Sequence, residues 1–79
     1  MQYHNHKKQL DLHGVRHGEV EYKVWMVLRE AEHSEQFPVK IITGNSSTMK
    51  QIVLNTVETM GLTPLQEYFP NKGYILVQG

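Results

Sequence analysis

The stretch QLDLHGVRHGEVEYKVWMVL, residues 9–28, decides the fold, because its hydrophobic periodicity changes midway. Up to Gly14, apolar residues alternate with polar ones, as in a strand with one buried face. From about His17 to His33 the apolar residues fall at helical spacing, and charged residues take the opposite side. The sequence therefore predicts a short strand, a glycine stop and an amphipathic helix of about four turns.

The same succession is repeated downstream. Residues 39–43, VKIIT, form a β-branched run that Gly44 ends, and residues 45–61, NSSTMKQIVLNTVETMG, have a Ser or Thr N-cap and a terminal glycine. Residues 63–69 and 73–78 read as two closing strands joined by the turn-rich PNKG. The order β-α-β-α-β-β predicts an α/β (α+β) two-layer sandwich, with a mixed four-stranded sheet and two helices on one face.

Length and composition narrow the class of protein. Seventy-nine residues make one small domain, expected at residues 9–79 after a frayed tail at residues 1–8. Eight basic residues balance eight acidic ones, so any binding of nucleic acid must be local or weak. The sequence has no cysteine, no apolar run of membrane-spanning length and no signal-peptide pattern. We therefore expect a cytoplasmic protein, or one of the host cytoplasm if it is viral.

The first candidate site lies where the first strand ends. Ligands of open α/β sheets bind beyond the carboxyl ends of parallel strands, and Asp11 and His13 project there from one face. A carboxylate beside an imidazole orients the ring and makes it more basic, which suits a general base or half of a site for a divalent metal ion. The alternative is that Asp11 caps the following loop and His13 merely ends a strand.

The second candidate site is the loop that opens the second helix. Gly44, Asn45, Ser46 and Ser47 lead into a helix whose first N–H groups and positive dipole end attract phosphate, and Lys50 adds charge one turn later. The alternative is an ordinary capped loop, because this is no P-loop.

Several other residues invite a functional interpretation. Arg16 and His17 follow Gly14 and flank the same edge, although solvated surface is the alternative. The HNH letters at residues 4–6 are not a specific nuclease or metal motif. Packing is the default for the aromatic residues, which include Tyr68, Phe69 and Tyr74 near the last turn and Trp25 at the margin of the helical core.

With LDLHG in the first strand, VKIITGNSS about 30 residues later and NKGYILVQ in the closing hairpin, the chain resembles the Smr (small MutS-related) domain over residues 9–78. The resemblance implies a fold like the C-terminal domain of a bacterial translation initiation factor. It also implies endonuclease activity, as DNA nicking or RNA cleavage, and binding of branched or structured nucleic acid. Asp11 and His13 occupy the family's catalytic positions, and Gly14 ends the same motif.

The resemblance is incomplete in the second motif, usually His-Gly-x-Gly, where Thr43 replaces the His and Ser46 replaces the second Gly. Losing the His removes a donor near the scissile phosphate, and losing the Gly restricts close backbone approach. Two hypotheses follow. One is a nucleic-acid-binding domain with endonuclease activity, and the other is a catalytically inactive module of the same fold that binds nucleic acid or protein.

Overall fold

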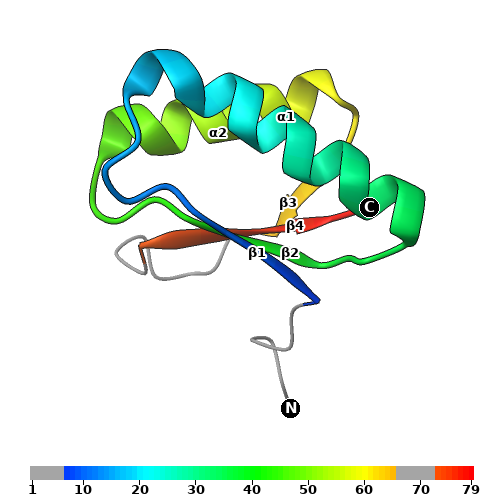
Figure 1. Ribbon diagram of the computed structural model, residues 1–79. Helices are drawn as coiled ribbons and strands as arrows, with labels where there is room; N and C mark the ends of the chain where they lie inside the picture. The colour runs from blue at the N-terminus through cyan, green and yellow to red at the C-terminus, as the bar shows by residue number, and fades with distance from the viewer. Residues whose placement is uncertain (1–6, 66–72) are drawn as a thin grey trace.

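The computed structural model describes residues 7–65 and 73–79 as a mixed four-stranded sheet with both helices on one face (Figure 1). This is the small α+β layout that the sequence predicts. The elements in chain order are β1 (Lys8–Asp11), α1 (His17–Ser34), β2 (Val39–Ile42), α2 (Ser47–Thr59), β3 (Thr63–Leu65) and β4 (Tyr74–Gln78).

The strands lie in the order β1-β2-β4-β3. β1 and β2 are parallel and in register from Lys8 opposite Val39 to Asp11 opposite Ile42. β4 is antiparallel to both β2 and β3. A parallel pair requires a crossover, and α1 supplies it. The carboxyl ends of β1 and β2 therefore meet at one edge of the sheet.

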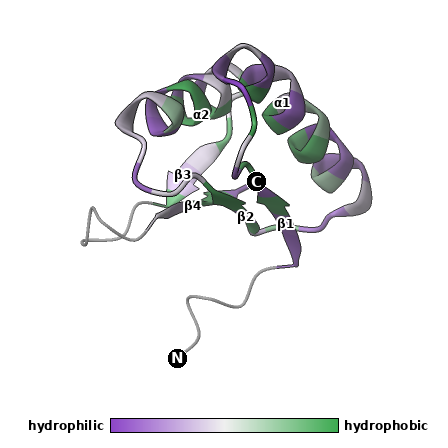
Figure 2. Cartoon of the chain, turned by 60° about the vertical axis from the view of Figure 1, so that its left-hand side comes forward, coloured by the Kyte–Doolittle hydropathy of each residue, from purple (hydrophilic) through white to green (hydrophobic). Residues whose placement is uncertain are grey.

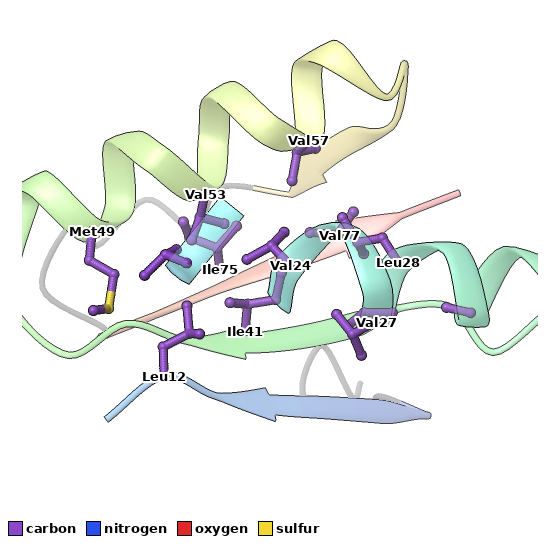
Figure 3. Packing of buried hydrophobic residues seen from close by; sticks show 13 residues of the cluster. Leu12, Val24, Val27, Leu28, Ile41, Met49, Val53, Val57, Ile75 and Val77 are labelled. Atoms are coloured by element: carbon purple, nitrogen blue, oxygen red, sulfur yellow. The ribbon is translucent and has the colours of Figure 1, made fainter. Parts of the chain in front are cut away.

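The hydrophobic core lies between the sheet and the two helices (Figures 2 and 3). Each helix contributes the apolar stripe that its sequence predicts, and β2 and β4 contribute the residues on their helix-facing sides. Leu10 of β1 is partly buried and packs against this core. Leu12, just beyond the end of β1, is fully buried. The core residues are Leu12, Val20, Val24, Val27, Leu28, Ala31, Val39, Ile41, Met49, Val53, Val57, Ile75 and Val77.

The strand bounds differ slightly from the prediction. β1 begins one residue earlier, at Lys8, because the main chain of Lys8 pairs with Val39, and it ends at Asp11 because the chain then turns. α2 is shorter than residues 45–61, since Ser46 is its N-cap and Thr59 its last residue. Part of the predicted hairpin, with Tyr68, Phe69 and Lys72, and the predicted tail up to residue 6 lie outside the described residues.

α1 is the longest helix of residues 7–65 and 73–79, with 18 residues. It carries four glutamates, a lysine and an arginine among its apolar residues. Within those two ranges no helix combines the length and apolarity needed to cross a membrane.

Candidate nucleic-acid interface

The loops after β1 and β2 form one continuous edge of the molecule. The N–H of Leu12 donates to the carbonyl oxygen of Ile42 at 3.0 Å, which extends the parallel pairing one residue past Asp11. Both helices begin from these loops, so their N-terminal ends point to the same side of the sheet (Figure 1). The positive ends of two helix dipoles therefore lie beside the two sequence motifs. We call this region, residues 11–17 and 43–50, the loop edge.

Asp11 holds the turn that follows β1. Its Oδ1 accepts a hydrogen bond of 2.9 Å from the main-chain N–H of His13, and the N–H of Val15 donates to the carbonyl of Leu12. Gly14 has a φ of 78°, a left-handed conformation that favours glycine. The hydrogen bond between Asp11 and His13 is thus made to the main chain of His13, as expected if Asp11 caps the loop. Both side chains are exposed, so the imidazole is accessible to a ligand.

Arg16 and His17 lie where α1 begins. Arg16 is the N-cap residue, its carbonyl accepts from the N–H of Glu19, and its side chain makes no capping hydrogen bond. Arg16 and His17 are both exposed at the loop edge. Glu19, however, places a carboxylate in the first turn of α1. This negative charge opposes an anionic ligand at the start of α1.

Thr43 and Gly44 hold the second loop in place through hydrogen bonds. Their two N–H groups both donate to the carbonyl oxygen of Gly73 at 2.9 Å, and the Thr43 hydroxyl donates to the carbonyl of Gly44. Only 6% of Thr43 is exposed. Gly44 has a φ of 67°, which turns the chain toward α2. The resemblance places Thr43 and Gly44 at the start of the second motif, where contact with nucleic acid is expected, but their main-chain N–H groups are already bonded within the protein.

The start of α2 combines a cap with polar side chains. The Ser46 hydroxyl accepts from the N–H of Met49 at 3.0 Å, and the Ser46 carbonyl accepts from the N–H of Lys50. Asn45 and Ser47 are exposed, and Lys50 is half-buried one turn into the helix. The first turn of α2 contains no acidic residue. Of the two helix starts, that of α2 is the more favourable for phosphate.

A divalent metal ion needs several oxygen or nitrogen ligands at one place. Within residues 7–65 and 73–79, no three His, Asp or Glu side chains come together as such a group. Asp11 and His13 supply two candidate ligands, and one carboxylate oxygen already accepts from the chain. Among the residues that the structure describes, these two side chains are fewer than the three or more that would make a metal site by themselves.

The structure adds residues that the sequence did not reveal. Gly73 anchors the second loop through its carbonyl, and its φ of 80° allows the chain to approach Gly44. Lys40 lies with its ammonium group 4.5 Å from the centroid of the Tyr74 ring, on the sheet face opposite the helices. Gly73, the glycine before the last strand, was a local sequence signal for a turn at that position. The contact between Lys40 and the Tyr74 ring depends on β2 and β4 being neighbours, which no local sequence pattern shows.

Trp25 lies at the margin between α1 and α2, where it is partly exposed. Trp25 is 41% exposed, and the guanidinium carbon of Arg29 lies 5.1 Å from the centroid of the Trp25 ring. The helical position of Trp25, one residue after the core residue Val24, turns the indole toward solvent.

The fold and the loop edge together define a small α+β domain with two strand-to-helix loops at one edge of its sheet. Comparison of this chain with protein-family models, with curated proteins and with solved structures found no match. The resemblance to the Smr domain therefore stays a prediction from the LDLHG and TGNSS motifs.

Proposed function

We propose that the loop edge binds a phosphate group of a structured or branched nucleic acid. The observation that carries this proposal is the meeting of two loops and two helix N-termini at one side of the sheet, with Arg16, His17 and Lys50 among their residues. The two positive helix ends, with Arg16 and Lys50, favour an anion at this side of the sheet. Asp11 and Glu19 place two carboxylates at the first loop, so the start of α2 is where an anion is favoured most.

The start of α2 is the phosphate position within this edge. The N–H groups of Ser47 and Thr48 lie in the first turn, where a helix has no carbonyl of its own to offer them. Ser47 adds an exposed hydroxyl and Lys50 a positive charge. Arg16 and His13, from the neighbouring loop, reach the adjoining sugar or phosphate of the same strand.

Few cations take part, so the binding is local and depends on salt. Each phosphate neutralised by a lysine or arginine contributes about 0.9 to the slope of log affinity against log salt concentration for duplex DNA. With Arg16 and Lys50 as the two cations, the proposal gives a slope of about −2 for duplex DNA. A much steeper slope would require a basic surface that the composition does not supply.

The test is a fluorescence anisotropy titration of labelled DNA and RNA hairpins and junctions at several salt concentrations. Arg16→Ala and Lys50→Ala each remove one cation, so each should weaken binding and lower the salt slope by about 1. Lys23→Ala is the matched control, because Lys23 is exposed on α1 and outside the loop edge.

Amide shifts followed in the same titrations locate the ligand. The proposal requires changes concentrated in residues 11–17 and 43–50. Equal losses in Lys23→Ala and Lys50→Ala, or amide shifts confined to other parts of the chain, would contradict it.

Endonuclease cleavage is a second candidate function at the same edge. It is favoured by the exposed His13 beside Asp11 in LDLHG, the positions that the Smr resemblance assigns to catalysis. In this proposal the neutral imidazole accepts a proton from water or from an RNA 2′-hydroxyl, and the oxygen then attacks the phosphorus. The P–O bond to the leaving sugar oxygen breaks, and that oxygen takes up a proton from the imidazolium so formed or from water. The N–H groups at the start of α2 stabilise the charge that develops on the phosphoryl oxygens. Asp11 fixes the main chain that carries the imidazole.

Cleavage is tested with supercoiled plasmid and with structured RNA. His13→Ala should abolish cleavage while leaving the fold intact, because His13 is exposed. His33→Ala provides the control, since His33 is also exposed but lies in the last turn of α1. Full activity in His13→Ala would indicate a contaminating nuclease and reject this candidate, while phosphate binding would still be decided by the titrations.

A further inference from the structure

A second surface lies on the side of α1 that faces away from the sheet. Tyr22, Trp25 and Met26 are 65%, 41% and 47% exposed, and they follow one another at i, i+3 and i+4. Arg29 continues the row at i+7, so the four side chains form one stripe along the helix. We call these four residues the outer stripe. Large apolar side chains in such a row belong to an amphipathic helix with a partner, and the core already occupies the opposite side of α1.

Trp25 is held in position within this stripe. The Arg29 guanidinium lies over its ring, and the Arg29 Nε lies 3.8 Å from a carboxylate oxygen of Glu32. These contacts restrict the rotamers of two long side chains before any partner binds, which lowers the entropy cost of docking. Tryptophan, tyrosine, methionine and arginine are also the residue types enriched at the centres of protein interfaces.

A groove of about 220 Å³ adjoins Trp25 between the two helices. Its charged members are Glu21, Arg29 and Glu32, and Arg29 pairs with Glu32, so the groove carries one carboxylate in excess. The apolar walls are the indole of Trp25 and the side chain of Met60. A lysine or arginine side chain matches this combination, because its methylene stem packs on apolar groups while its cation meets a carboxylate. The residues lining the groove are Glu21, Trp25, Arg29, Glu32, Thr56, Thr59 and Met60.

The charges of α1 select the kind of partner. The helix carries four glutamates, at positions 19, 21, 30 and 32, against Lys23 and Arg29. This excess of carboxylates repels nucleic acid and anionic lipid. It also opposes a second copy of the chain. An antiparallel pair centred on Trp25 and Met26 brings Glu19 opposite Glu32 and Glu21 opposite Glu30, and a parallel pair brings each glutamate opposite itself.

We propose that the outer stripe docks an amphipathic helix of another protein, whose apolar residues are flanked by lysine or arginine. The apolar face of the partner covers Tyr22, Trp25 and Met26, and one of its cationic side chains enters the groove beside Glu21 and Glu32. This surface is distinct from the loop edge and does not depend on nucleic-acid binding there.

Intrinsic fluorescence provides a direct test, because Trp25 is the sole tryptophan. The probe is a synthetic helical peptide of about four turns, with leucines at i, i+3, i+4 and i+7 and lysines on both sides. Titrated into the full chain, it should shift the Trp25 emission to shorter wavelength and perturb the amides of residues 21–32 and 56–60. The matched probe has the same leucines with glutamate in place of each lysine, and it should not bind.

Variants separate the groove from general charge. Glu21→Gln combined with Glu32→Gln should weaken the lysine peptide about tenfold or more, which corresponds to the loss of about 1.4 kcal/mol. Glu58→Gln, an exposed carboxylate of α2 that does not line the groove, should leave the affinity unchanged. Met26→Ser tests the apolar half of the stripe and should also weaken binding, with its fold checked by circular dichroism.

The proposal is overturned if the lysine and glutamate peptides bind alike, or if Glu58→Gln costs as much as the paired groove substitutions. It is also overturned if the amides of residues 21–32 shift with protein concentration alone, which would identify a second copy as the occupant. A shift of the same amides by an RNA hairpin would identify nucleic acid instead.

Discussion

The two loops of the loop edge share a plan but differ in what their side chains do. Each follows a parallel strand, turns at a glycine with positive φ and opens a helix. After β1, His13 and Arg16 are exposed, and Arg16 leaves the helix without a side-chain cap. After β2, Thr43 is buried and Ser46 caps the helix, while the carbonyl of Gly73 holds two main-chain N–H groups.

The exposed side chains of the first loop are available to a ligand, whereas the side chains of Thr43 and Ser46 in the second loop hold the fold. Side chains that make no structural contact can be selected for a ligand without cost to the fold, whereas those that hold a turn or a cap are constrained by stability. Thr43 and Ser46 are both structural here, since Thr43 is buried and Ser46 caps α2. The following substitutions test that division.

The largest effect is expected within the first motif itself. Leu12→Ala removes a fully buried side chain between Asp11 and His13, so it should lower the free energy of unfolding by about 2–5 kcal/mol in urea titrations. His13→Ala, one residue later and exposed, should change it by less than about 0.5 kcal/mol. Comparable losses of unfolding free energy for Leu12→Ala and His13→Ala would show that Leu12 is no more important to the fold than His13. Leu12→Met keeps the volume and should cost less than about 1.5 kcal/mol.

A smaller effect is expected at the glycine that turns the second loop. A Cβ at Gly44 meets nothing within 4 Å, so Gly44→Ala tests the left-handed backbone alone and should cost about 1–2 kcal/mol. Gly18→Ala is the control, because Gly18 lies in α1 with equally open space around it. Alanine is the better helix former, so the control should be neutral or stabilising by up to about 1 kcal/mol. If both variants change the stability in the same direction, the positive φ of Gly44 does not make alanine unfavourable there.

The smallest pair of effects compares the two caps. Ser46→Ala loses the hydrogen bond to the N–H of Met49 and should destabilise the domain by about 1 kcal/mol, whereas Ser46→Asp should restore most of it. Arg16→Ser should instead stabilise the domain by about 0.5–1 kcal/mol, because it offers a hydroxyl at an N-cap that has none. Thermal unfolding by circular dichroism measures both. The same Arg16→Ser variant should bind nucleic acid more weakly, so a gain in both properties would contradict the assigned role of Arg16.

Local patterns were sufficient to predict the elements and the edge at which the motifs meet. The change from alternation to helical spacing at Gly14, and the Ser cap before Met49, are short-range signals with direct physical causes. Strand alternation predicted Asp11 and His13 on one face of a strand, but β1 ends at Asp11 and His13 lies in the turn that follows. Their contact did not follow from local patterns, since the sequence cannot show whether a carboxylate bonds an imidazole or a main-chain N–H.

The sequence by itself determined which segments are strands and helices, which side of each is apolar, and that two glycine-ended strands carry the candidate residues to one edge. Only the tertiary structure decided that β4 lies between β2 and β3, so that Gly73 reaches Thr43 and Gly44. It also decided that Trp25 is partly exposed and lines a groove between the two helices. The reason is that periodicity reports the burial of a residue within its own element, whereas hydrogen-bond partners and surface grooves depend on which elements become neighbours.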